Sequence, residues 1–464
     1  MIMSEFFKKM NIACLMFFCL SMFFFHSCKD EAGNSNEYDP GKPVEVTGFT
    51  PKNGSAKTRM HIYGKNFGTD VSRISVKIGG LPAKVIGSNG EIIYCLVPYR
   101  AIGGTVEVAV GSDAEYITAD ESFVYQSKTV VSTLAGYVDP TGQKEVKDGP
   151  FDDCGFEGPR WMTVDPENKH HIYMIDASGV TGVSIRLIDL ETRSISTILQ
   201  RGQGNWDNMR QLEFSLTGDT LLIANERDVD KAIAVSYVTR ANAFKRPQHL
   251  IYYRRNNTCG IHPVNGELYY NSRTTGEIMR YDWQTETSKV LYTLKSRDCQ
   301  FFVFFHPSGN YAYMTIPNKK LIMKAEYDWE NKTLKVANNF AGSDGQEGWQ
   351  DGQGTNALLG NPMQGCFVKN ERYVQEGKSD IYDFYFADQN AHCIRYVTPE
   401  GFVYTYAGRG SKGVNSNAYG YVDGDLLKEA RFNQPVGIAY DEENKTLYIG
   451  DANNARIRTI VIDE

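Results

Sequence analysis

The sequence predicts an all-β protein in which a small β-sandwich is followed by a six-bladed β-propeller. Three observations indicate this fold: aromatic residues reach 12% beside 43 Gly, residues 44–126 alternate between apolar and polar, and residues 129–464 repeat one motif. Charged residues at 23% and hydrophobic residues at 41% are ordinary for a globular domain. The net charge of −7 gives no support for a nucleic-acid partner.

Residues 1–27 have the pattern of a signal peptide rather than of the fold. Lys8 and Lys9 precede a short apolar run, which ends in Phe25-His26-Ser27-Cys28. These four residues resemble a bacterial lipobox, which implies that Cys28 becomes the lipidated first residue; an ordinary secretory peptide is the alternative. The following residues, 29–31, resemble the surface-export signal of Bacteroidetes lipoproteins. The resemblance implies an outer-membrane lipoprotein exposed at the cell surface. Residues 33–43 are mostly polar with Gly and Pro, so we interpret residues 28–43 as a tether.

Residues 44–126 form the predicted sandwich. Short alternating runs, such as 60–63, 74–78, 92–97 and 105–110, are separated by Gly, Pro and Asn turns. The order of Phe49-Thr50-Pro51, then 62–68, then 76–80, then Val97-Pro98, then 123–125 resembles an IPT/TIG domain of the immunoglobulin-like class. Such domains usually act as spacers in surface proteins, and a binding role is the alternative.

Residues 129–464 contain six units, centred near positions 161, 211, 258, 302, 365 and 437. The last unit reads Pro435-Val436-Gly437-Ile438-Ala439, then 447–451, then Ile457-Arg458. These elements resemble NHL repeats, most strongly in units one, five and six, and repeats of about four strands indicate a propeller. The final unit lacks its last strand, whereas Val130–Gly136 supplies one. We therefore expect this N-terminal strand to close the final blade and cover its edge.

The remaining Cys, Asp and Asn patterns predict structural roles rather than metal binding or catalysis. Six Cys follow the lipobox without CxxC or zinc spacing, so we expect buried thiols, with no metal and no cofactor. A recurring column after the second strand is interpreted as turn caps, and three Asp-Gly pairs in the long loops are interpreted as turns. The column comprises Asp176, Asn225, Asn271, Asp388 and Asp451, and the pairs begin at Asp148, Asp351 and Asp423.

Long loops enter the first strands of three units and place candidate ligand-binding groups on one rim. Aromatic faces stack on sugar rings, and arginines donate paired hydrogen bonds to hydroxyl or carboxylate oxygens. The candidates are Arg160, Trp161, Trp206, Arg210, Phe302 and Trp349. As alternatives, Trp161 and Phe302 plug the channel mouth, and the two arginines pair with acids such as Asp207 or Glu213. His392, in a turn on the rim side, is retained as the candidate acid–base group.

The leading hypothesis is a cell-surface glycan-binding lipoprotein of a polysaccharide-uptake system. Its expected partners are a polysaccharide or oligosaccharide, a SusC/SusD-like transporter and the outer membrane, which it would reach through its lipid. Much of this follows from the resemblance to Bacteroidetes surface proteins that carry IPT/TIG and NHL repeats. A glycan lyase or hydrolase that uses the same rim, or a protein–protein interaction module, are the alternatives.

Overall fold

The computed structural model describes residues 36–55, 57–98, 101, 104–111, 114–126, 129–139, 141–178, 182–294, 298–411 and 417–461. The predicted signal peptide, Cys28 and the first part of the tether lie outside these ranges. The chain divides into two compact units, Met1–Ser127 and Lys128–Glu464, which are described separately. Among the described residues, no helix is both long and apolar enough to cross a membrane.

The N-terminal unit is a β-sandwich whose strands follow the hydrogen-bonded path β1-β3-β6-β5-β4-β7-β8. Strand β5 pairs with β4 through residues 81–83 and with β6 from Lys84 onward, with a register shift between Val85 and Gly87. It thereby links the two halves of the sandwich around a core that includes Phe49, Ile62 and Phe123. The strands are β1 Glu45–Thr50, β2 Asn53–Gly54, β3 Arg59–Lys65, β4 Ile74–Ile78, β5 Leu81–Ser88, β6 Ile92–Leu96, β7 Val106–Val110, β8 Ile117–Thr118 and β9 Val124–Tyr125.

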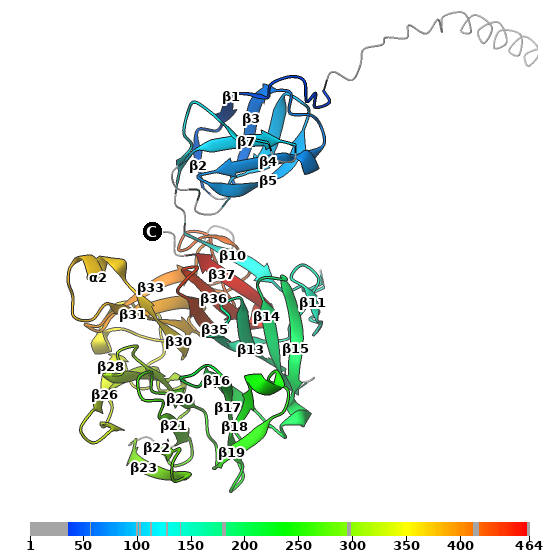
Figure 1. The fold of residues 1–464 in the computed structure, drawn as a ribbon. Helices are drawn as coiled ribbons and strands as arrows, with labels where there is room; N and C mark the ends of the chain where they lie inside the picture. Colours follow the sequence, from blue (N-terminus) through cyan, green and yellow to red (C-terminus); the bar gives the residue numbers. More distant parts are fainter. Residues whose placement is uncertain are drawn as a thin grey trace, which may run out of the picture. The chain divides into compact units, whose positions relative to one another are not determined.

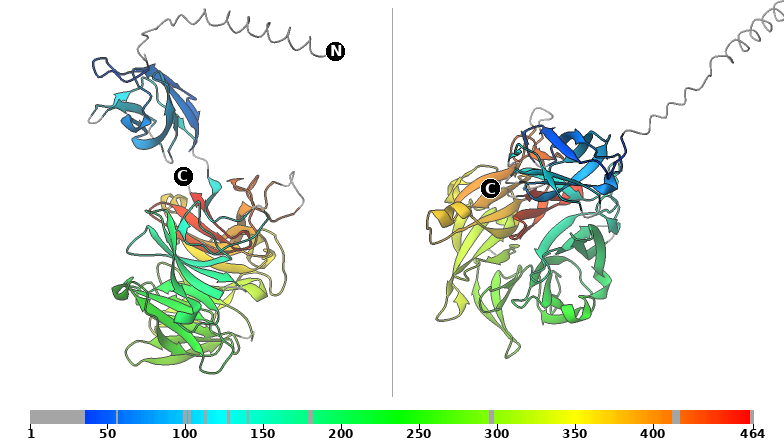
Figure 2. Two further views of the ribbon diagram at one scale, coloured as in Figure 1. Left: turned by 90° about the vertical axis from the view of Figure 1, so that its right-hand side faces the viewer. Right: turned by 45° about the horizontal axis from the view of Figure 1, so that its top comes forward.

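The C-terminal unit contains six separate sheets arranged in a ring, so the predicted six-bladed propeller is confirmed (Figure 1). Figure 2 shows the same sheets from two further directions. Blade one contains β11 Gly149–Pro150, β12 Pro159–Val164, β13 His171–Ser178, β14 Gly182–Asp189 and β15 Ser194–Gln200. Blade two contains β16 Met209–Phe214, β17 Thr220–Asn225, β18 Ile233–Thr239 and β19 Gln248–Tyr252, and blade three contains β20 Cys259–Ile261, β21 Leu268–Ser272, β22 Glu277–Asp282 and β23 Thr287–Thr293.

Blade four contains β24 Phe302–Phe305, β25 Tyr311–Ile316, β26 Leu321–Asp328, β27 Thr333–Leu334 and β28 Asn338–Gly342. Blade five contains β29 Gly352–Gln353, β30 Pro362–Lys369, β31 Tyr382–Asp388, β32 Cys393–Val397 and β33 Phe402–Gly408. Blade six contains β34 Gly424–Asp425, β35 Pro435–Asp441, β36 Thr446–Asp451, β37 Arg456–Val461 and the N-terminal β10 Val130–Ala135. The short helical segments are α2 Glu371–Gln375, η2 Val71–Arg73, η3 Arg201–Gln203, η4 Arg240–Asn242, η5 Pro317–Lys319, η6 Gly354–Asn356 and η7 Ala452–Asn454.

The ring closes through strand β10, as the sequence predicts. Strand β10 pairs antiparallel with β37, with Val131 opposite Ile460 and Ser132 opposite Thr459. Its other edge pairs with β34, so β10 lies inside the sheet of blade six (Figure 1). An N-terminal strand thus satisfies the backbone groups of the C-terminal strand, which would otherwise form an open edge.

Buried arginines tie the long loops to blades one, five and six. Arg458 is fully buried; it pairs with buried Asp451 at 2.8 Å and with Asp423 at 2.6 Å, and Asp423 also accepts from the Thr133 amide. The equivalent groups are Arg186, Asp176, Asp148 and Thr197 in blade one, and Arg395, Asp388, Asp351 and Thr405 in blade five. The Asp-Gly carboxylates are therefore ion-pair anchors, which corrects their interpretation as simple turns.

The column of Asp and Asn residues after the second strands is structural, as expected, but its contacts differ from those of a turn cap. Asp451 accepts from the Asn433 amide, and Asn225 accepts from the amides of Asp207 and Asn208. Each of these contacts fastens the loop that enters the first strand of the same blade. The column therefore sets the position of the rim loops, because it holds their backbone against the blade.

Candidate binding site at the propeller rim

A polar hollow of about 380 Å³ lies at the rim where the sequence places a ligand. Three cationic side chains line it, namely Arg160, Arg210 and Lys320. Four side-chain amides complete its polar wall: Gln300, Asn318, Asn361 and Gln389. Arg160 and Arg210 lie at the start of the first strands β12 and β16, and the others come from loops entering first strands or from turns between second and third strands. Together these residues define the rim hollow. Among the described residues, no carboxyl group lines it.

Arg160 and Arg210 meet in the rim hollow but have different surroundings. Nε of Arg210 pairs with Glu226 at 3.0 Å, and Glu226 also accepts from Arg273 at 3.1 Å. Burial lowers the pKa of Arg210 to about 10, and Arg160 and Arg273 add to this decrease, so Arg210 remains charged at neutral pH. The alternative of a salt bridge is correct for Arg210, although its partner is Glu226 rather than Asp207 or Glu213.

Arg160 is the cation of the rim hollow that keeps its charge available. Its side chain is exposed, and within the described ranges no carboxylate lies within ion-pair distance of it. Burial among its neighbours lowers the pKa of the guanidinium, while Asp176 opposes this effect. Lys320, by contrast, pairs with Glu347 at 2.7 Å and contacts the Asn361 side chain. Arg160 is therefore the group best placed to donate to a ligand oxygen.

Trp161 and Phe302 form a plug below the rim and present no face to a ligand in the rim hollow. They belong to blades one and four, which are opposite each other in a ring of six, and their ring centroids lie 4.7 Å apart. Only 2% of Trp161 and 1% of Phe302 is exposed. The plug is thus the correct alternative for these two residues, and their prediction as stacking platforms is wrong.

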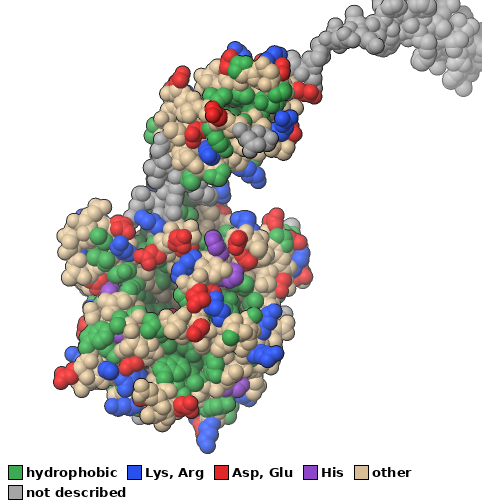
Figure 3. Space-filling view, viewed as in Figure 1, with side chains coloured by type: hydrophobic (Ala, Val, Ile, Leu, Met, Phe, Trp, Pro, Cys, Tyr) green, Lys and Arg blue, Asp and Glu red, His purple; other side chains and the backbone are tan. Residues whose placement is uncertain are grey.

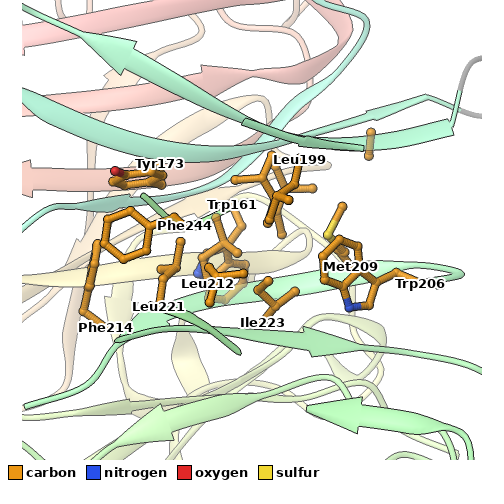
Figure 4. Close-up of a cluster of buried hydrophobic side chains, with 14 of the residues drawn as sticks. Trp161, Tyr173, Leu199, Trp206, Met209, Leu212, Phe214, Leu221, Ile223 and Phe244 are labelled. Carbon is orange, nitrogen blue, oxygen red and sulfur yellow. The ribbon is translucent and has the colours of Figure 1, made fainter. Parts of the chain in front are cut away.

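Trp206 lies in the hydrophobic core between the first two blades. It is 1% exposed, and its Nε1 donates to Oγ of Ser236 at 3.0 Å. In the close-up it lies beside Met209, while Trp161 lies nearer to Leu212 (Figure 4). The prediction of Trp206 as a ligand-binding residue is therefore wrong, since its indole has no free face or donor.

Trp349 is exposed but does not line the rim hollow. Its Nε1 donates to Oγ1 of Thr405 on the outer strand β33, and the Arg409 guanidinium stacks on its ring at 4.0 Å. His392 also lies outside the hollow, although it follows Gln389 closely. Its Nδ1 accepts from the Gln434 amide at 3.1 Å, and burial lowers its pKa. This imidazole already has a structural partner on one side.

Sequence reasoning missed the amides of the rim and one buried asparagine. Asn257 lies one residue before the centre of its repeat unit at position 258, just as Arg160 and Arg210 lie one residue before the centres at 161 and 211. It is fully buried, and neither polar atom of its side chain has a hydrogen-bond partner among the described residues. A polar residue at this repeated position in unit three was the available signal. Lys320 gave no such signal, because the fold alone brings its turn to the channel mouth.

All six cysteines in the described ranges are free thiols, and five of them are buried. Burial raises the pKa of Cys95 to about 12, so this thiol stays protonated. The expectation of small buried thiols rather than a disulfide framework is confirmed. The space-filling view shows acidic and basic side chains interspersed over the propeller, with apolar side chains near its centre (Figure 3).

Fold and rim together define a class: a two-unit β-protein whose propeller has a cationic, amide-lined hollow at one end of its channel. Residues 43–125 match the IPT/TIG domain family. Human NHL repeat-containing protein 2 is 25% identical over 340 residues, which is 68% of this chain, and the chain spans 40% of that protein's length.

Three crystal structures from Bacteroides resemble the whole architecture. An auxiliary nutrient binding protein from Bacteroides thetaiotaomicron is 41% identical, with a TM-score of 0.70, over 92% of this chain and all of that one. An auxiliary nutrient binding protein from Bacteroides ovatus is 36% identical, with a TM-score of 0.74, over 91% of this chain and 99% of that one. A third structure, from Bacteroides thetaiotaomicron, is provisionally described as a phosphatase. It is 36% identical, with a TM-score of 0.70, over 92% of this chain and 98% of that one. The chain belongs to the family that these Bacteroides proteins represent.

Proposed function

We propose that this protein is a nutrient-binding lipoprotein of the cell surface that captures oligosaccharides in the rim hollow. The observation that carries the proposal is the exposed, unpaired Arg160 among four side-chain amides, in a hollow without a lining carboxyl group among the described residues. Guanidinium and amide groups donate hydrogen bonds that suit sugar hydroxyl and carboxylate oxygens. The family relatives described as auxiliary nutrient binding proteins support a nutrient as the ligand.

The charge of the rim hollow favours glycans that carry carboxylates. Arg210 and Lys320 are each partly neutralised by a glutamate, whereas Arg160 is not. A uronate carboxylate at Arg160 would form a charge-assisted, bidentate pair, which a neutral sugar cannot form. We therefore expect acidic oligosaccharides to bind more tightly than neutral ones of equal length.

Binding without turnover fits the hollow better than catalysis does. Glycan hydrolysis uses a pair of carboxyl groups, and none lines the rim hollow among the described residues. His392, the histidine candidate, has one ring nitrogen engaged by the Gln434 amide. Release of unsaturated or shortened products from a polysaccharide panel would overturn this choice in favour of a lyase or hydrolase.

Isothermal titration calorimetry with neutral and acidic oligosaccharides tests the binding proposal. Arg160→Ala is expected to weaken binding of the acidic ligands at least tenfold, because the unpaired guanidinium is lost. Arg227→Ala is the matched control, since Arg227 pairs with Asp207 and does not line the hollow. Equal weakening by both variants, or no binding of any glycan to the wild type, would refute the proposal.

The cellular part of the proposal concerns the lipid anchor and the transporter. Cys28 in the lipobox would attach the chain to the outer membrane, and the protein would deliver its ligand to a SusC/SusD-like transporter. Cys28→Ala is expected to abolish lipid labelling and release the protein from the membrane fraction. Unchanged labelling of the variant would exclude the anchor, and surface protease accessibility of the wild type tests its exposure.

A further inference from the structure

A second cavity, of about 440 Å³, lies at the end of the central channel opposite the rim hollow. This basal cavity is lined by the C-terminal parts of the first strands of the six blades, β12, β16, β20, β24, β30 and β35. Its walls are about equally polar and apolar, and their aromatic part includes Trp161, Phe304, Phe305 and Phe367. A concave site of this volume and lining suits a small organic molecule.

The plug and two buried glutamines separate the basal cavity from the rim hollow. Gln364 bonds both the amide and the carbonyl of Met162, at 2.9 and 2.6 Å, and accepts from the Ile438 amide. Gln211 accepts from the Thr258 hydroxyl at 2.6 Å on the other side of the ring. These bonds join different blades at the level of the plug, between the residues that line the rim hollow and those that line the basal cavity.

Among the residues that the structure describes, one carboxyl group, that of Glu213, lines the basal cavity. Its Oε2 receives a long hydrogen bond of 3.4 Å from Gln211, and no cation in the described part of the chain forms an ion pair with it. Lys169, also at the cavity, is exposed at its edge. Burial raises the pKa of Glu213 to about 7. A carboxylate held among aromatic walls without a counter-ion is unfavourable, and a ligand cation would relieve that cost.

We propose that the basal cavity is a second binding site, which takes a small organic ammonium ion with its hydrocarbon part against the aromatic walls. The ammonium group would donate to Glu213, and the nearby rings would add cation–π attraction. A metal ion fits poorly, because Ca²⁺ needs six or more oxygen ligands and the described residues bring no three metal-ligating side chains together. One carboxylate beside aromatic rings selects an amine instead.

Calorimetry at pH 8, where Glu213 is mainly ionised, tests this site. The probes are benzylammonium, phenethylammonium and cyclohexylammonium, with uncharged benzyl alcohol as the matched ligand. We expect at least one amine to bind the wild type at least tenfold more tightly than benzyl alcohol does. Glu213→Gln is expected to remove this preference, while Glu191→Gln, an exposed change of equal charge, keeps it.

Two further variants distinguish binding in the basal cavity from binding elsewhere on the protein. Ile261→Trp fills the cavity without changing its charge and is expected to abolish amine binding, which a ligand held by surface charge would not show. Arg160→Ala is expected to leave amine binding unchanged, so failure of the rim proposal does not affect this one. Absence of binding by all three amines, or equal amine affinity of Glu213→Gln and the wild type, would overturn the proposal.

Discussion

Replacing Arg458 with Met tests whether the buried arginines stabilise the propeller. The side chain of Arg458 is fully buried, and it pairs with Asp451 at 2.8 Å and Asp423 at 2.6 Å. It also donates to the carbonyls of Arg431 and Val422 at 3.0 and 2.8 Å. Methionine has a similar length but leaves Asp451 buried without its counter-ion and two carbonyls without their donors.

Removal of one partner of a buried ion pair costs about 3–5 kcal/mol, because an uncompensated charge stays behind. The unfolding entropy of a propeller of this length is about 0.7 kcal/mol/K, so the melting temperature should fall by about 4–7 °C. Burial already raises the pKa of Asp451 to about 6, and loss of Arg458 should raise it further. Part of the cost is therefore recovered by protonation when the pH is lowered.

Thermal and urea unfolding of the propeller, followed by circular dichroism, measure this loss. Arg372→Met is the control, because Arg372 is 80% exposed and forms only a surface pair with Glu376. A surface pair contributes less than about 1 kcal/mol, so the control should melt within about 1.5 °C of the wild type. Equal stability of the two variants would refute the claim that the arginine network holds the rim loops.

Three other changes test separate parts of the structure. Folding raises the pKa of Glu213 from 4.5 to about 7, so the stabilising contribution of this group is complete below pH 4.5 and is lost as the pH rises through 7. Glu213→Gln should therefore stabilise the protein relative to the wild type at pH 8, and less so at pH 5. Thermal melts of both proteins at the two pH values measure the difference. A chain that starts at residue 128 should fold as a monomer, whereas one that starts at 137 lacks β10 and should aggregate through the exposed edge of β37 in size-exclusion chromatography. Trp206→Ala should lower the unfolding free energy by about 3–5 kcal/mol through a core cavity, without a matching change in ligand affinity for the residual folded protein.

Much of the site depends on contacts between blades, which local patterns do not contain. Trp161 and Trp206 have the same residue type and both lie near the start of a first strand, yet one plugs the channel and the other fills a core between blades. The side chains that do form the rim hollow with Arg160 include Gln300 and Lys320, whose spacing along the chain carries no signal. Polar side chains become a site only when the ring brings their loops together.

The sequence by itself determined the all-β class, the sandwich before the propeller, the six units and the closing strand. These features follow from local periodicity, turn residues and repetition, since each blade is one unit of chain and the final unit visibly lacks its strand. Only the tertiary structure decided that the channel is plugged, that Arg160 stays unpaired while Arg210 binds Glu226, and that Glu213 faces a second cavity. Burial and charge pairing are set by residues tens to hundreds of positions apart, so the ring must close before either is defined.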